Sequence, residues 1–180
     1  DHHIFTRDGW ETANSFQHPT LNLQMRTSIS DYAQLGRRFV PMECKVIKVV
    51  ADSGAQSCLW SRKLYLRCGF TMKDLIPVSH NMTAANKAPI EIDGAILLRL
   101  SGESDCGRIW EAAVMVYISP QSNSFFLSKE AMIQLGIIPR TFPSVGATDI
   151  QRQSDVAAVS DSTPMSNSTP VSNSTPMRNS

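Results

Sequence analysis

One acidic residue stands inside an otherwise apolar stretch of the sequence. The largely apolar, β-branched run 46–51 leads directly into Asp52, and Ser53 and Gly54 follow it. A carboxylate between two apolar segments is partly withdrawn from water, and such a group is suited to acid–base chemistry. Ser53 can donate a hydrogen bond, and Gly54 lets the backbone approach another group closely. This stretch is therefore the first candidate for catalysis.

Three interpretations of Asp52 stay open on these residues alone. Asp-Ser-Gly is ordinary turn chemistry after a strand, because a short polar side chain can bond the backbone ahead of it. The carboxylate could also cap a helix or contact a nucleotide. The third interpretation is catalysis, which the apolar residues on both sides of Asp52 favour over a plain surface turn.

The elements that must position Asp52 are mostly strands. Alternating or β-branched runs predict strands over 21–25, 44–51, 88–102 with a kink at Gly94, and 108–118. The segments 31–39 and 61–70 are each compatible with a short helix or an irregular turn. Over 128–136 the sequence predicts a helix, with Ser128 as its N-cap and Gly136 as its stop. Several short strands with one clear helix favour a small all-β barrel or sandwich.

Composition divides the 180 residues into three parts. Residues 1–40 are polar and weakly patterned, and we expect a linker or extension there. Residues 41–146 hold the dense strand signals and form the expected domain. Residues 147–180 contain a repeat rich in Ser, Thr, Asn and Pro, for which disorder is the expectation. Because the chain begins with Asp1 rather than Met, we expect a piece of a longer protein.

Several classes of partner are not expected. The net charge of +1 implies no polyanion, so we expect no direct nucleic-acid binding by this segment. No apolar run reaches the length of a membrane span, so we expect no membrane contact. The four cysteines and four histidines lack the spacing of a zinc site, so we expect neither metal nor cofactor.

The ordered set of motifs resembles the retroviral-type, or retropepsin-like, aspartic proteases of long-terminal-repeat retrotransposon Gag-Pol polyproteins. "VVADSGAQ" looks like their active-site loop, in which an apolar run precedes Asp-Thr/Ser-Gly-Ala. "MTAANKAPIEIDGAILLRLSG" resembles their flap hairpin and the strands after it, and "VYISPQSNSFFLSKEAMIQLGIIP" their closing strand, short helix and exit. The resemblance spans roughly residues 1–146 and is most specific at 46–60 and 117–139.

The resemblance implies a closed small β-barrel with one short C-terminal helix, which is half of a two-fold dimeric peptidase. Asp52 would be catalytic, and Ser53, Gly54 and Ala55 would complete its loop. A water activated between two Asp52 carboxylates would hydrolyse the peptide bonds of a retroelement polyprotein. The partners implied are a second copy of the chain and an extended polypeptide. A substrate-binding flap would use the residues Ala84, Ala85, Asn86, Lys87 and Ala88.

Two positions depart from the pattern of that family. Members commonly carry a glycine between an apolar pair and the last helix, where this chain has Ser128. Their flap tip often carries Asn-Gly, where this chain has Asn86-Lys87. A catalytically inactive domain of the same fold, used for dimerisation or peptide binding, is therefore the alternative to an active peptidase. For either one, the expected location is the cytoplasm or an intracellular particle.

Overall fold

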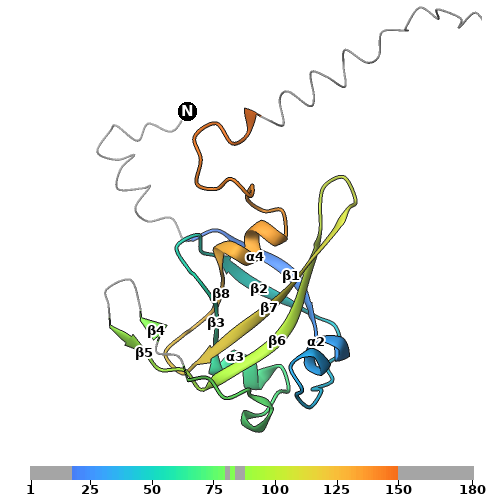
Figure 1. Ribbon diagram of the computed structural model, residues 1–180, viewed down its shortest axis with the longest axis vertical. Coiled ribbons are helices and arrows are strands. Elements are labelled where there is room, and N and C mark those ends of the chain that lie inside the picture. The colour runs from blue at the N-terminus through green and yellow to red at the C-terminus, as the bar shows by residue number, and fades with distance from the viewer. Residues whose placement is uncertain (1–17, 80–81, 84–87, 150–180) are drawn as a thin grey trace, which may run out of the picture. The chain divides into compact units, whose positions relative to one another are not determined.

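The structure is a computed structural model that describes residues 18–79, 82–83 and 88–149 (Figure 1). The chain divides into two compact units, residues 1–140 and 141–180, and the barrel described below lies within the first unit. The expected tail lies outside the described residues from position 150 onward. Four of the expected flap residues, at positions 84–87, lie outside them as well.

Six strands of the described residues close into a barrel in the order β1-β2-β8-β3-β7-β6. Their bounds are β1 Thr20–Arg26, β2 Lys45–Ala51, β3 Cys58–Ser61, β6 Gly94–Glu103, β7 Ile109–Ser119 and β8 Phe125–Leu127. The strand β1 closes the barrel because it pairs antiparallel with both β2 and β6. The pairs β2–β8 and β3–β7 are parallel. The expected closed β-barrel with a short helix near its end is therefore confirmed.

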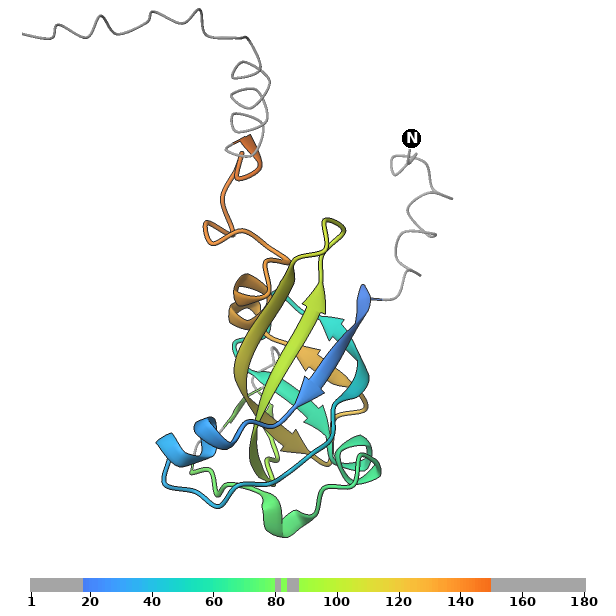
Figure 2. The ribbon, with the colours of Figure 1, turned by 90° about the vertical axis from the view of Figure 1, so that its right-hand side faces the viewer.

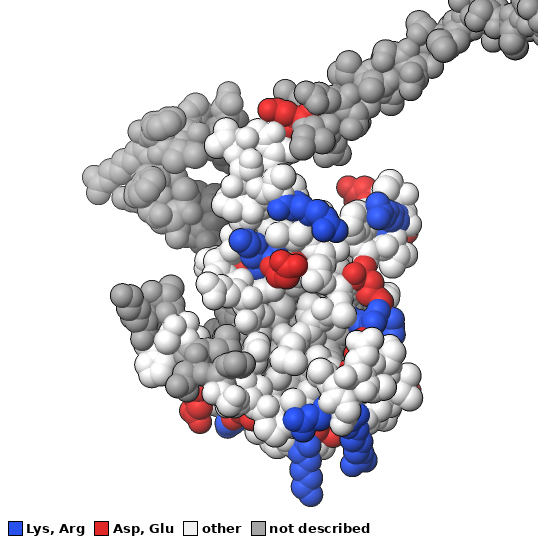
Figure 3. Space-filling model, in the orientation of Figure 1, with Lys and Arg blue, Asp and Glu red and all other residues white. Residues whose placement is uncertain are grey.

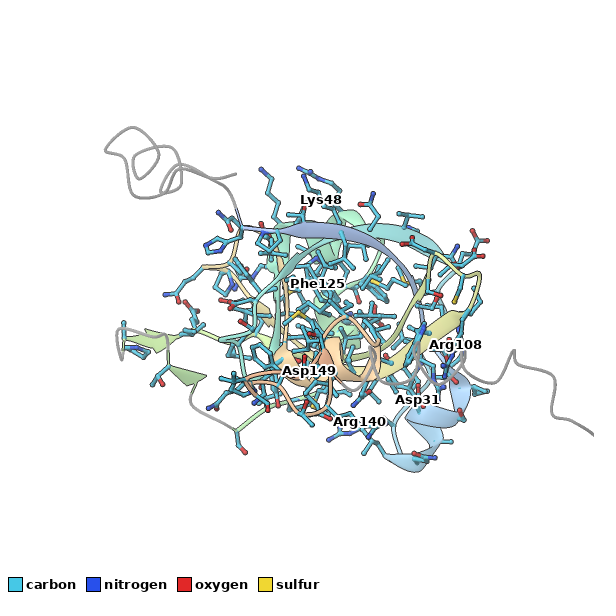
Figure 4. The ribbon with its side chains drawn as sticks, turned by 90° about the horizontal axis from the view of Figure 1, so that it is seen from above. Asp31, Lys48, Arg108, Phe125, Arg140 and Asp149 are labelled. Carbon is cyan, nitrogen blue, oxygen red and sulfur yellow. The ribbon has the colours of Figure 1, made fainter. Side chains whose placement is uncertain are left out.

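Apolar side chains fill the barrel at every second strand position. On β6, Ile96, Leu98 and Leu100 are buried, which is the period that directs side chains to one face of a strand. The ring of Trp60 on β3 lies in the core, 5.4 Å from the ring of Phe125, centroid to centroid. Figure 4 shows Phe125 inside the circle of strands. The core therefore forms where strands distant in sequence meet.

Three short α-helices and one 3₁₀ turn accompany the barrel in the described residues. They are α2 Ile29–Gln34, α3 Arg62–Arg67, the 3₁₀ turn η1 Met72–Asp74, and α4 Lys129–Gln134. The expected last helix is confirmed with its ends, because Ser128 caps its first turn and Gly136 follows it with a φ of 68°. The helix α4 lies against β7 (Figure 2). No described helix has both the length and the apolar character that crossing a membrane requires.

The barrel begins earlier in the chain than the expected domain boundary at residue 41. Residues 1–40 were expected to be an extension, but they contain β1, which is a wall strand, and α2. The strand 21–25 was itself expected. That this strand belongs to the barrel was not expected, because β1 pairs with β2 and with β6, which begins only at residue 94. Pairing over that distance leaves no local signal.

Four charged side chains tie α2 to the barrel wall. Arg99 on β6 donates hydrogen bonds of 2.8 and 2.9 Å to the carboxylate of Asp31 on α2. Arg99 also donates a 3.0 Å bond to Glu111 on β7, as does Arg26 at the end of β1. The hydrogen bonds from Arg99 hold the pKa of Asp31 below its usual value, against a smaller opposing effect of burial.

We expect Asp31→Asn to lower the free energy of unfolding at pH 7 by about 1 kcal/mol, because this partly exposed ion pair is screened by solvent. A lowered folded-state pKa means that ionised Asp31 stabilises the fold above the pKa of an unfolded aspartate, about 3.9. That contribution is lost as the pH falls through the lower folded-state pKa. Urea unfolding at pH 7 and at about pH 3 should therefore show the difference from wild type shrinking in acid.

Asp105→Asn is the matched control, since Asp105 lies exposed in the turn between β6 and β7. We expect the control to leave the unfolding free energy within about 0.5 kcal/mol of wild type at both pH values. An equal loss from the two variants, or a loss for Asp31→Asn that does not depend on pH, would contradict the assignment.

Candidate active site

Asp52 is the first residue after β2, and it opens a tight loop. Its side-chain Oδ1 accepts a 3.0 Å hydrogen bond from the Gly54 N–H, and its carbonyl accepts a 3.1 Å bond from the Ala55 N–H. Asp52 and Ala55 are half-buried, whereas Ser53 and Gly54 are exposed. The structure therefore brings the four predicted loop residues together in one turn. The interpretation of Asp52 as a turn residue is therefore confirmed, because one of its carboxylate oxygens accepts the hydrogen bond from Gly54 inside the turn.

Two further backbone hydrogen bonds fix this loop to the junction between β8 and α4. The Asp52 N–H donates to the Leu127 carbonyl at 3.2 Å, and the Lys129 N–H donates to the Ala55 carbonyl at 3.0 Å. They continue the parallel pairing in which Ala51 of β2 lies opposite Leu127 of β8. The loop is thus held at its first and last residues by two residues of one distant segment, Leu127 and Lys129.

An apolar row lies beside the loop on the face of the strands opposite the core. Val50 pairs with Phe126, Phe126 with Leu59, and Leu59 with Tyr117, so the row crosses β2, β8, β3 and β7. Cross-strand partners share a face of a sheet. All four side chains are half-buried, and none belongs to the barrel core. A carboxylate next to such a row can meet an extended chain that carries apolar side chains.

Three other aspartates in the described residues, Asp31, Asp74 and Asp93, have structural partners. Asp31 pairs with Arg99, Asp93 pairs with Arg62, and Asp74 accepts from the backbone and side chain of Thr71 to cap η1. None of the ion pairs among the described residues involves Asp52. Asp52 differs from Asp31 and Asp93 because backbone bonds rather than a cation hold its loop.

No group of three His, Cys, Asp or Glu side chains in the described part of the chain is placed to hold a metal ion. Lys and Arg side chains and Asp and Glu side chains are interspersed over the face in Figure 3. That face offers no extended surface of one sign.

The predicted flap region contains a short hairpin, formed by β4 Met82–Thr83 and β5 Pro89–Ile90. Of the expected tip residues, Ala88 is described and exposed, and the other four, Ala84, Ala85, Asn86 and Lys87, lie outside the described residues. In Figure 1 the hairpin projects away from the barrel wall. The predicted hairpin is thus present, and the role of its tip stays a prediction.

The base of this hairpin is fastened to the barrel. Ile76 and Ala95 exchange backbone hydrogen bonds of 2.8 and 2.9 Å. Asp93 accepts a 2.6 Å hydrogen bond from Nε of Arg62 at the start of α3, and its backbone N–H donates to the Ile118 carbonyl at 2.8 Å. Segments entering and leaving the hairpin are therefore clamped together, so that the hairpin stands on a fixed base.

The residues that hold the Asp52 loop against the β8–α4 junction could not be predicted from the sequence. Leu127 and Lys129 act through backbone groups, which carry no residue signal. Ser128 stood out as a helix cap and as a departure from the usual glycine, yet nothing in the sequence paired it with Cys58 of β3. The structure places the Sγ of Cys58 3.5 Å from the Oγ of Ser128.

The chain is similar to several solved structures. It matches the retroviral protease-like domain of Ddi1 from Leishmania major at 15% identity over 63% of this chain and 73% of that one, with a TM-score of 0.35. It matches EIAV protease bound to an inhibitor at 14% identity over 68% and 92%, with a TM-score of 0.39. A retropepsin-like aspartic protease from Rickettsia conorii matches at 12% identity over 66% and 84%, with a TM-score of 0.35.

No protein-family model matches the sequence, and no curated protein matches it either. The roles of individual residues therefore rest on the geometry of the Asp52 loop.

We expect Gly94→Ala to loosen the base of the hairpin and to destabilise the protein by about 1–3 kcal/mol. Gly94 has a φ of 156°, and a Cβ there would lie 2.8 Å from the Leu75 Cβ and 2.9 Å from the Ile76 carbonyl oxygen. Thermal unfolding measures the loss, and amide exchange at Ile76 and Ala95 should become faster.

Gly69→Ala is the matched control, because Gly69 also has a positive φ, 97°, but a Cβ there would meet nothing within 4 Å. The two variants share the cost of a left-handed backbone, so the difference between them reports the crowding at Gly94. If Gly69→Ala proves as destabilising as Gly94→Ala, the close approach at the hairpin base contributes nothing.

Proposed function

We propose that this chain is one half of a homodimeric aspartic endopeptidase that hydrolyses peptide bonds. The observation that carries the proposal is the Asp52 loop, whose half-buried carboxylate is positioned by bonds from both loop ends to the β8–α4 junction. The likeness of residues 46–60 and 117–139 to the retroviral-type proteases supports the same conclusion. The loop is a device for holding one carboxylate in a defined place.

Peptide hydrolysis by carboxylates needs two such groups that share a proton. The ionised group takes a proton from the attacking water, and the protonated group polarises the substrate carbonyl. Like charges a few ångströms apart do not both ionise readily, so one proton stays on the pair. Asp31, Asp74 and Asp93 are already engaged elsewhere in the fold, and Asp105 and Asp149 are exposed and outside any loop like that of Asp52. The second carboxylate of the proposal is therefore Asp52 of a second copy, related by a two-fold axis.

The proposed substrate is an extended polypeptide, and within a retroelement it is the element's own polyprotein. The apolar row Val50–Phe126–Leu59–Tyr117 beside the loop supports this proposal, because a strand-like peptide presents alternate side chains to such a row. The hairpin of β4 and β5, on its clamped base, is the proposed cover of the bound peptide. The proposed location is the cytoplasm or an intracellular particle of the element.

We expect Asp52→Asn to lower the cleavage rate by at least about 10²-fold, because the amide cannot act as a general base. Asparagine keeps the shape of the side chain and can still accept the Gly54 hydrogen bond, so the melting temperature should stay close to that of wild type. The assay follows cleavage of a polyprotein segment that flanks the chain. The control is Asp105→Asn, the same change in an exposed turn, which should cleave at the wild-type rate.

Cleavage by Asp52→Asn at the wild-type rate would remove Asp52 from the mechanism. If the wild-type chain dimerises or binds extended peptides but does not cleave them, the inactive binding domain is the correct alternative.

We expect the site to be shared between two chains, and mixing experiments test this directly. When Asp52→Asn chains are added in equal amount, random pairing leaves about half of the activity per wild-type chain, since every mixed dimer has one carboxylate. Activity per chain should also fall on dilution below the dimer dissociation constant. Undiminished activity in the mixture, together with a monomer in sedimentation at the assay concentration, would contradict the shared site.

A further inference from the structure

We propose that Cys58 and Ser128 form a buried polar lock that positions the Asp52 loop. Both side chains are buried and bond to each other rather than to Asp52, so they are positioning residues rather than catalytic ones. The inference rests on the proposed function for its consequence in catalysis, but the lock itself is a statement about the loop and can be tested without catalysis.

The lock consists of two hydrogen bonds between segments that lie 70 residues apart in the chain. The Cys58 thiol donates to the Ser128 Oγ at 3.5 Å, and the Ser128 N–H donates to the Cys58 Sγ at 3.4 Å. Both residues are buried, with 2% and 4% of their surface exposed. Because each residue both donates and accepts, the two bonds fix the orientation of Ser128 relative to Cys58. An apolar contact of the same size would not fix that orientation.

Ser128 lies between the two residues that hold the loop. Its neighbour Leu127 accepts from the Asp52 N–H, and its other neighbour Lys129 donates to the Ala55 carbonyl. Cys58 is the first residue of β3, three positions after Ala55 on the far side of the same loop. The lock therefore closes a ring from β2 through the loop to β3 and back through residues 127–129. A displacement of Ser128 moves both anchors of Asp52 at once.

The Ser128 hydroxyl has a second partner, which joins α4 to the lock. Its Oγ accepts a 3.2 Å hydrogen bond from the Ala131 N–H and so caps the helix. Burial raises the pKa of the Cys58 thiol, which keeps the thiol protonated and able to donate. One side chain thus connects the start of α4, the start of β3 and the anchors of the candidate catalytic loop.

The test compares Cys58→Ala, Ser128→Ala, the double variant and Cys58→Ser in the full chain. Each single alanine variant should lower kcat by about 10- to 100-fold with little change in KM, because a misplaced carboxylate slows chemistry more than it weakens binding. The kcat of the double variant should be no lower than that of the slower single variant, because both substitutions break the same pair of hydrogen bonds. Cys58→Ser keeps a donor and should retain most of the wild-type kcat.

Ser61→Ala is the matched control. Ser61 is a buried serine, 3% exposed, that caps α3 by accepting from the Leu64 N–H. The Ser61→Ala variant loses a helix cap of the same kind as Ser128→Ala does, but the cap belongs to α3 and not to the Asp52 loop. Its kcat should therefore stay within about twofold of wild type. If Ser128→Ala fails to fold, Cys58→Ala carries the test, because that variant leaves the cap of α4 in place.

Amide hydrogen exchange provides the readout that does not depend on catalysis. The N–H groups of Asp52, Ala55 and Lys129 should exchange faster in Cys58→Ala and Ser128→Ala, and at the wild-type rate in Ser61→Ala. Unchanged exchange and unchanged kcat in the two alanine variants would overturn the lock, as would a kcat lost equally in Ser61→Ala. If these N–H groups exchange faster in the two alanine variants and the wild-type chain cleaves nothing, the lock is supported and the proposed function is refuted.

Discussion

The parallel pairing of β2 with β8 is the interaction on which the rest of the candidate site depends. It places the end of β2, and therefore Asp52, beside Leu127 and Lys129, whose backbone groups hold the loop at both ends. Parallel neighbours cannot be joined by a tight turn. The chain therefore travels from residue 51 to residue 125, through most of the barrel, before the partner of β2 is in place. The Asp52 loop is a product of barrel closure and not of its own sequence alone.

Barrel closure also decides which parts of the molecule are free to act. The strand β1 pairs with β2 along one edge and with β6 along the other. The described barrel strands therefore leave no open edge to pair with other chains. Trp60 and the rings around it fill the interior. Loops and hairpins at the strand ends then project from a rigid wall, as β6 and β7 show where their hairpin extends beyond the barrel (Figures 1 and 2). A loop on such a wall can hold a side chain in a fixed position.

Asp52 is held in a different way from Asp31 and Asp93. Asp31 and Asp93 are bound by arginines and serve to fasten α2 and the base of the β4–β5 hairpin. Asp52 is held through the backbone of its loop, without an ion pair among the described residues. A carboxylate with a cation beside it is committed to the ionised form. Because no ion pair of the described residues includes Asp52, its carboxylate is not committed to a cation, and the proposed dimeric site places a second carboxylate beside it.

The sequence by itself determined the elements whose signals are local. The strand 44–51, the strand 108–118 and the helix with Ser128 and Gly136 at its ends were all predictable, because periodicity and capping act within a few residues. The turn at Asp52 was equally predictable from the sequence. Only the tertiary structure decided that β1 belongs to the barrel wall, that the short strands β3 and β8 pair with each other, and that Ser128 meets Cys58. These contacts join residues 65 to 77 positions apart, and their stability comes from groups brought together by burial, which no local pattern encodes.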